Sequence, residues 1–185
     1  PSDKIKPFHP IVNNESLNLL EIPVTSGKNA FSWDLYGRGY DGPDPSEQWK
    51  KDFERIYAAG GVYVPLFHPA FIGKDTRLLG TLREFIDYTQ RYDIWMTTLR
   101  DLAIWHRNKE KLHITIKNPK GTISWLEIEN NGNKIEGLTI RVHGKIKAFG
   151  QNISVDSITQ GDNANTKITF KILDDGKTRI ILLRK

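Results

Sequence analysis

A short apolar run over residues 61–69, Gly-Val-Tyr-Val-Pro-Leu-Phe-His-Pro, constrains the fold of this chain more than any other stretch. The run ends on His68 and is stopped at once by Pro69. Its length and composition are typical of a buried parallel strand, and in α/β barrels such strands present polar side chains at their carboxyl ends. Helical patterns lie on both sides of a second strand pattern over residues 93–97. The alternation of strand and helix predicts an α/β arrangement for this part of the chain.

Three amphipathic helices are expected in the first 110 residues. Ser46 is expected to cap the first helix, and the Gly60-Gly61 pair to end it. The second is expected over residues 75–91, and the third after Thr98. The apolar positions expected on their buried faces are Trp49, Phe53, Ile56 and Tyr57, then Leu78, Leu79, Leu82, Phe85 and Ile86, then Leu99, Leu102, Ala103 and Trp105.

From Leu112 onward the pattern is that of short strands separated by turns rich in Gly, Asn and Asp. The expected strands are residues 112–117, 124–129, 138–142, 145–149, 153–158, 167–173 and 178–183. Residues 174–177, Asp-Asp-Gly-Lys, predict a tight hairpin between the last two. The spacing predicts a small antiparallel β-sandwich over residues 111–185, in which Trp125 is more typical of a core anchor between the sheets than of a binding face.

Charge distribution and the absence of cysteine exclude some kinds of site but do not indicate a single function. Residues 1–110 carry 14 basic and 15 acidic residues, and residues 111–185 carry 13 and 7. The basic half favours an anionic partner, but its lysines follow predicted strands without clustered aromatics, which indicates a solvated face rather than nucleic-acid binding. The absence of cysteine excludes disulfides and thiolate metal sites.

No apolar stretch approaches the roughly 20 residues that a membrane helix needs. The first residues, Pro-Ser-Asp-Lys-Ile-Lys-Pro, have no apolar core that could serve as a signal peptide. The chain is therefore expected to be soluble and without a membrane span, and its localisation stays open.

Four segments, in the same order along the sequence, resemble the last third of a polysaccharide deacetylase domain. That family includes Nod-type carbohydrate esterases and allantoinase-like enzymes. They are residues 19–24 (Leu-Leu-Glu-Ile-Pro-Val), 60–69, 77–88 and 93–105. The likeness covers roughly residues 5–108. It implies that residues 1–110 are the C-terminal part of a distorted (β/α) barrel of seven strands, followed by the appended β-sandwich over residues 111–185.

The resemblance also implies roles for single residues. Leu66-Phe67-His68 matches the closing motif of the family, in which the leucine lines the acetyl pocket and the histidine is the general acid on the leaving amine. Histidine suits this role because its ordinary pKa lies near neutrality. The alternative is that His68 only caps a strand end and bonds to nearby backbone.

A loop before the first helix supplies three weaker candidates. Asp34 lies where the family often places an aspartate beside aromatic residues, although a loop aspartate that satisfies its own backbone is equally expected. Trp33 and Tyr36 are candidates to stack on a sugar face, or to form a local packing cluster.

The chain departs from the family where the metal chemistry is concerned. The Asp-Asp and His-x-x-x-His pairs that supply the base and the metal ligands are missing, since Asp174-Asp175 falls in the expected hairpin and the five histidines form no close pair. A divalent, Zn-like metal is therefore expected only in the full-length parent, with its ligands outside this chain.

Two functions stay open. The first is the C-terminal fragment of a metal-dependent deacetylase that hydrolyses N-acetyl or other non-peptide C–N amide bonds, inactive without the upstream half of the barrel in the same precursor or a companion chain. The second is a non-catalytic carbohydrate-binding or structural module that acts through the β-sandwich. The expected partners are a carbohydrate or small amide substrate and the upstream half, with self-association left open and no nucleic acid.

Overall fold

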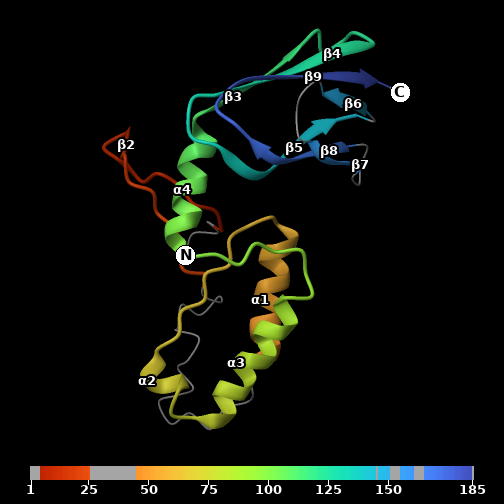
Figure 1. The fold of residues 1–185 in the computed structure, drawn as a ribbon. Coiled ribbons are helices and arrows are strands. Elements are labelled where there is room, and N and C mark those ends of the chain that lie inside the picture. The colour runs from red at the N-terminus through yellow and green to blue at the C-terminus, as the bar shows by residue number, and fades with distance from the viewer. Residues whose placement is uncertain (1–4, 26–44, 145, 151–154, 161–164, 185) are drawn as a thin grey trace. The chain divides into compact units, whose positions relative to one another are not determined.

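The computed structural model describes residues 5–25, 45–144, 146–150, 155–160 and 165–184. Helices and antiparallel sheets make up this part of the chain, and it contains no closed barrel (Figure 1). The chain divides into two compact units, Pro1–Leu99 and Arg100–Lys185. The break in sequence pattern expected after residue 110 thus falls later than the division between the units, because most of helix α4 (Leu99–Glu110) belongs with the strands that follow it.

The first unit contains helix α1 (Ser46–Ala58), which starts one residue earlier than a Ser46 cap would require. Pro45 is the N-cap residue and already has helical dihedral angles, so Ser46 lies inside the helix and the expected serine cap is wrong. The predicted end is confirmed. Gly60 has a φ of 61°, and the Gly60 and Gly61 amides donate to the Tyr57 and Ile56 carbonyls, which is the Schellman arrangement of a helix end.

Helix α3 (Thr76–Thr89) begins one residue after Asp75, the predicted start, and Asp75 is its N-cap residue. The Asp75 carboxylate accepts hydrogen bonds from the Arg77 and Leu78 amides at 2.9 and 3.2 Å. Helix α2 (Pro69–Ile72) is a single turn before it. The core of this unit is the aromatic and aliphatic cluster Trp49, Phe53, Ile72, Leu78 and Phe85, against which Tyr63, Phe67, Leu82, Tyr88, Tyr92 and Ile94 pack.

The strands expected over residues 61–67 and 93–97 are wrong as assigned elements, since both segments are irregular in the structure. A strand needs a continuous ladder, and Pro65 has no amide hydrogen to donate to one. The only strands among the described residues of this unit are β1 (Ile11–Val12) and β2 (Glu15–Ser16), joined by two asparagines with positive φ.

The second unit confirms all seven predicted strands. They are β3 (Leu112–Lys117), β4 (Ile123–Asn130), β5 (Ile135–His143), β6 (Ile146–Gly150), β7 (Val155–Gln160), β8 (Asn165–Leu173) and β9 (Gly176–Arg184). They form two antiparallel sheets, in the orders β3-β4-β9-β6 and β5-β8-β7 (Figure 1). Alternate residues from both sheets, among them Leu126, Ile168, Phe170 and Ile180, build one shared hydrophobic core.

The tight hairpin predicted between the last two strands is wrong. Strand β8 pairs with β5 and β7, whereas β9 pairs with β4 and β6, so residues 174–175 carry the chain from one sheet to the other. The turn sequence specifies only that the chain reverses. Asn130 holds the connection from the end of β4, because its side-chain amide donates to the Asp174 carbonyl at 3.0 Å.

Trp125 does not anchor the core, which corrects the expectation from the sequence. The buried face of β4 carries Ser124, Leu126, Ile128 and Asn130. Trp125 lies on the opposite face, with 36% of its surface exposed. The predicted alternation along β4 is confirmed, but alternation alone does not specify which of the two faces is buried.

The cap of α3 can be tested with a matched pair of aspartates. Asp75→Ala removes the acceptor of two backbone hydrogen bonds and should lower the free energy of unfolding of the first unit by about 1 kcal/mol. Asp87→Ala, at an exposed position inside the same helix, should change it by less than about 0.5 kcal/mol. Urea unfolding followed by the helical circular dichroism signal measures both; equal effects would contradict a capping role.

Candidate functional site

His68 lies at the junction between the irregular segment 61–67 and the short helix α2. Its carbonyl accepts a hydrogen bond from the Ile72 amide at 3.1 Å, and Pro69 occupies the first helical position, where a missing amide hydrogen costs nothing. The buried Ile72 fixes this turn to the hydrophobic core of the unit. His68 is half-buried, so its side chain has access to solvent from an anchored backbone.

The segment that leads to His68 is held between two other parts of the first unit. The Val62 amide donates to the Ile5 carbonyl at 2.6 Å, and the Thr25 amide donates to the Val64 carbonyl at 2.9 Å. The buried Thr25 hydroxyl in turn accepts from the Val64 amide. A Cβ atom at Gly61 would lie only 2.8 Å from the Ile5 side chain, so glycine permits this close approach.

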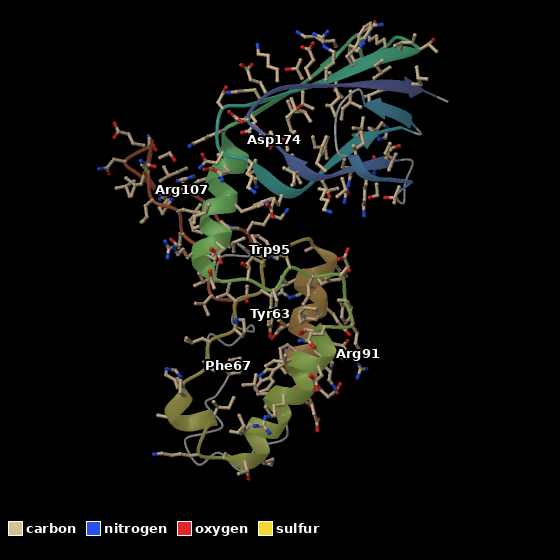
Figure 2. All side chains as sticks on the ribbon, in the orientation of Figure 1. Tyr63, Phe67, Arg91, Trp95, Arg107 and Asp174 are labelled. Atoms are coloured by element: carbon tan, nitrogen blue, oxygen red, sulfur yellow. The ribbon has the colours of Figure 1, made fainter. Side chains whose placement is uncertain are left out.

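Side chains of the segment before His68 differ in burial: some pack on the core of α1 and α3, and others are exposed to solvent. Tyr63 and Phe67 (Figure 2) pack on the core of α1 and α3, and the Phe67 ring meets the Trp49 ring edge-on with centroids 5.4 Å apart. Leu66 has 43% of its surface exposed. Leu66 therefore lies outside the core that holds its neighbour Phe67.

The remaining candidates from the sequence are not positioned by the structure. Trp33, Asp34 and Tyr36 lie outside the described residues. Leu66 and His68 are the two candidates that it places, and they come from one continuous segment.

Two tyrosine hydroxyls of the first unit, those of Tyr63 and Tyr88, have a raised pKa and are not candidates for a general base at neutral pH. Burial raises the pKa of the Tyr63 hydroxyl, and the charge of Asp52 raises it further. Asp52 is buried on α1 and accepts a hydrogen bond from the Gln48 side chain at 3.1 Å. The pKa of Tyr88 is also raised, chiefly by its hydrogen bond to the Glu54 carboxylate. Both tyrosines keep their protons near neutrality.

The donor set of the described residues does not suit a Zn-like ion. Nowhere in this part of the chain do three histidine, aspartate or glutamate side chains come close enough to hold a metal. Among the described residues, no metal-binding cluster surrounds His68.

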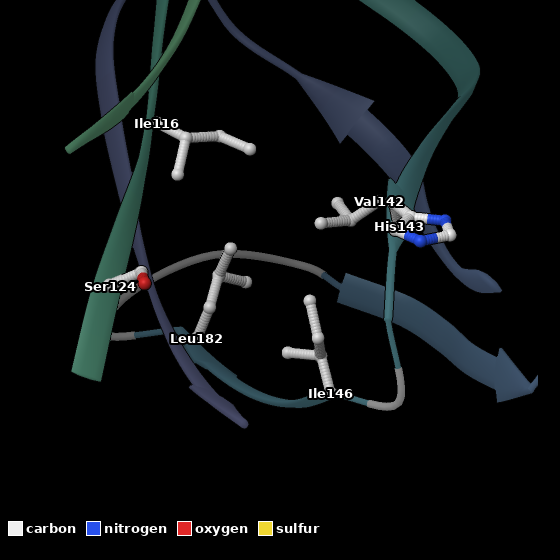
Figure 3. A pocket seen from close by; sticks show the side chains of 6 residues that line it. All are labelled: Ile116, Ser124, Val142, His143, Ile146 and Leu182. Atoms are coloured by element: carbon white, nitrogen blue, oxygen red, sulfur yellow. The ribbon is translucent and has the colours of Figure 1, made fainter. Parts of the chain in front are cut away.

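Neither Leu66 nor His68 lines either of two hollows found in the described part of the chain. The first measures about 140 Å³, lies between the sheets of the second unit and is mostly apolar (Figure 3). The other, of about 300 Å³, lies on α1 and α3 and mixes basic with acidic groups, its lining being Ser46, Lys50, Glu84, Phe85, Asp87, Tyr88 and Arg91.

Trp125, which the sequence favours as a core anchor, is instead an exposed aromatic side chain on the second unit. Trp125 and Ile123, the latter with 46% of its surface exposed, project from the outer face of β4. In the register of this sheet Trp125 lies opposite Lys117 and Ile181. A basic and two apolar neighbours thus surround the indole ring.

No protein-family model matches the chain, and neither the curated proteins nor the solved structures give a significant match. The likeness to polysaccharide deacetylases therefore depends on the four sequence segments alone. In the part of the chain that the structure describes, no helix combines the length and apolar character that crossing a bilayer requires.

Proposed function

We propose that this chain is the C-terminal portion of a metal-dependent polysaccharide deacetylase, in which His68 protonates the leaving nitrogen of an N-acetyl or related amide. Leu66 lines the pocket for the acyl group. The observation that supports this most is the placement of Leu66 and His68 on an anchored segment next to Phe67, which is packed into the helices.

The bonds around Val64 also favour a barrel fragment. The Thr25 amide donates to the Val64 carbonyl, and helix α1 lies between residues 23–25 and 62–64 in the sequence. In the proposal this is the order of a strand, a helix and a second strand. Ile94 packs on the same helices from the next segment. In the proposal these segments become parallel strands of a distorted seven-stranded barrel when the upstream half supplies their missing neighbours, and residues 111–185 form an appended β-sandwich.

The proposal assigns the divalent metal and the catalytic base to that upstream half, in the same precursor or a companion chain. The chain alone is then inactive toward amides. The exposed Val24 and Leu66 are apolar surface that the upstream half would cover.

The role of His68 is tested on the natural protein with N-acetylglucosamine oligomers, by measuring acetate release. Loss of a general acid typically costs 10²- to 10⁴-fold, so His68→Ala should lower kcat by at least about 100-fold. His113→Ala, at an exposed position on β3, is the matched control and should leave kcat within about twofold. An unchanged kcat in His68→Ala would overturn the assignment.

A second candidate function is supported by the exposed indole of Trp125. In this proposal the second unit is a non-catalytic module that binds a neutral carbohydrate on the outer face of sheet β3-β4-β9-β6. The flat aromatic ring offers an apolar face to the C–H side of a sugar, and Lys117 beside it offers hydrogen-bond donors.

Binding of neutral polysaccharide tests this second candidate by affinity electrophoresis of the full chain in gels that contain soluble chitin or xylan. Trp125→Ala should abolish the retardation, because the stacking surface is removed. Ile172→Ala, which removes an equally exposed apolar side chain from the other sheet, should leave it unchanged. Retardation that survives Trp125→Ala, or none in the unmodified chain, would count against this face.

A further inference from the structure

The outer face of sheet β5-β8-β7 places two basic side chains directly opposite each other. Arg141 on β5 is the register partner of Lys167 on β8, and both are exposed. Their neighbours Ile140 and Ile168 are buried in the core, so the two cations lie together on the solvent side of the sheet. Like charges at directly opposed positions of an antiparallel pair are destabilising.

The charges of the other sheet are arranged differently. On its outer face Glu127 lies within ion-pair distance of both Lys117 and Arg179, and Glu129 lies 3.6 Å from Lys177. Each of these three cations has an anion opposite or beside it. Among the described side chains, by contrast, no carboxylate forms an ion pair with Arg141 or Lys167.

The rest of the face is rich in groups that bind polar ligands. The hydroxyls of Thr139 and Thr169 are 3.0 Å apart across the same two strands, next to the basic pair. Thr159 and Ser157 continue the two rows onto β7. Strand alternation puts Lys171 on this face as well, four residues and about 13 Å along β8 from Lys167.

We infer that this face, defined by Arg141, Lys167 and Lys171 with the hydroxyls of Thr139, Thr159 and Thr169, binds a linear acidic polysaccharide. Basic side chains repeated along one strand suit a polymer that carries several carboxylate or sulfate groups better than a single small anion. The threonine hydroxyls donate to and accept from sugar hydroxyls between those groups.

The same face is poorly suited to nucleic acid. Binding of single strands relies on aromatic side chains on which bases stack, and His143 is the only ring on the described part of this face. His143 lies on the side of β5 opposite Val142 (Figure 3) and its Nδ1 is 3.2 Å from the Asn165 side-chain oxygen. The described outer face of this sheet also presents no helix that could enter a groove of duplex DNA.

This site involves neither His68 nor Trp125, so its test is independent of both proposed functions. The experiment measures binding of the full chain to polygalacturonate, dextran sulfate, uncharged dextran and duplex DNA by isothermal titration at several salt concentrations. The two acidic polysaccharides should bind and dextran should not. Duplex DNA that binds as tightly as the acidic polysaccharides would overturn the choice of ligand.

Matched charge variants test the residues. Arg141→Gln with Lys167→Gln should lower the affinity for both acidic polysaccharides at least tenfold, and should make log K less steeply dependent on log salt, because fewer counterions are released on binding. Lys177→Gln with Arg179→Gln removes the same net charge from the other sheet and should lower affinity less than threefold. An equal fall in affinity for both double variants would show a general effect of net charge and would refute the site.

The unfolding temperature of each variant is the control for correct folding. Because the opposed cations repel, the Arg141/Lys167 double variant should unfold at the same temperature as the unmodified chain or higher. Exchange of the two residues, Arg141→Lys with Lys167→Arg, keeps both charges and should retain binding within threefold. Loss of binding in this exchange variant, with its unfolding temperature unchanged, would contradict recognition by charge.

Discussion

The edge-on packing of Phe67 against Trp49 decides how the candidate site of the first unit is built. It fixes one side chain of the segment 61–67 in the core of α1 and α3, and Ile72 fixes the turn that follows. His68 lies between these two anchored residues, so apolar packing on both sides sets its backbone position. Full burial of a phenylalanine side chain is worth roughly 1.5–3 kcal/mol, and the partly buried Phe67 gains a share of that, on the order of one hydrogen bond or more.

In the second unit, polar side chains at the ends of strands form hydrogen bonds to the connections between the two sheets. Its two sheets share a core of alternate apolar residues, but the connections β4–β5, β5–β6, β6–β7 and β8–β9 each carry the chain from one sheet to the other. Buried Thr166 anchors one of them, because its hydroxyl donates to the Gly144 carbonyl and accepts from the Ile146 amide. Asn130 holds the connection between β8 and β9 in the same way. These hydrogen bonds stabilise the connections between sheets, because the hydrophobic pattern does not specify which sheet the next strand joins.

Local pattern predicted the elements of this chain better than their partners. The seven strands of the second unit and helices α1 and α3 follow from alternation, periodicity and end signals. The pairing of β8 and β9 with different sheets could not be predicted, because the Asp-Asp-Gly-Lys turn describes a reversal and not a neighbour. The segments 61–67 and 93–97 have the composition of strands, but composition does not show whether the neighbouring strands of a ladder are present.

The candidate sites show the same difference between features within one segment, which the sequence predicts, and features that depend on strand pairing, which it does not. His68 was identified because its motif is contiguous, whereas the opposition of Arg141 and Lys167 depends on the register between strands that are distant in sequence. Trp125 was assigned to the wrong face, since a one-residue change of register moves every side chain to the other side of a sheet. Distances between residues on different strands therefore could not be predicted from the sequence, whereas the closeness of Leu66 and His68 within one segment could.

The intact mass of the natural protein, measured together with its metal content, tests the proposed deacetylase origin most directly. The proposal predicts a species larger than 21.2 kDa that carries an upstream segment, or a stable complex with a companion chain, and that holds about one equivalent of a Zn-like ion. A lone 21.2 kDa species without metal would contradict it and would leave the two faces of the second unit as the functional part of the chain.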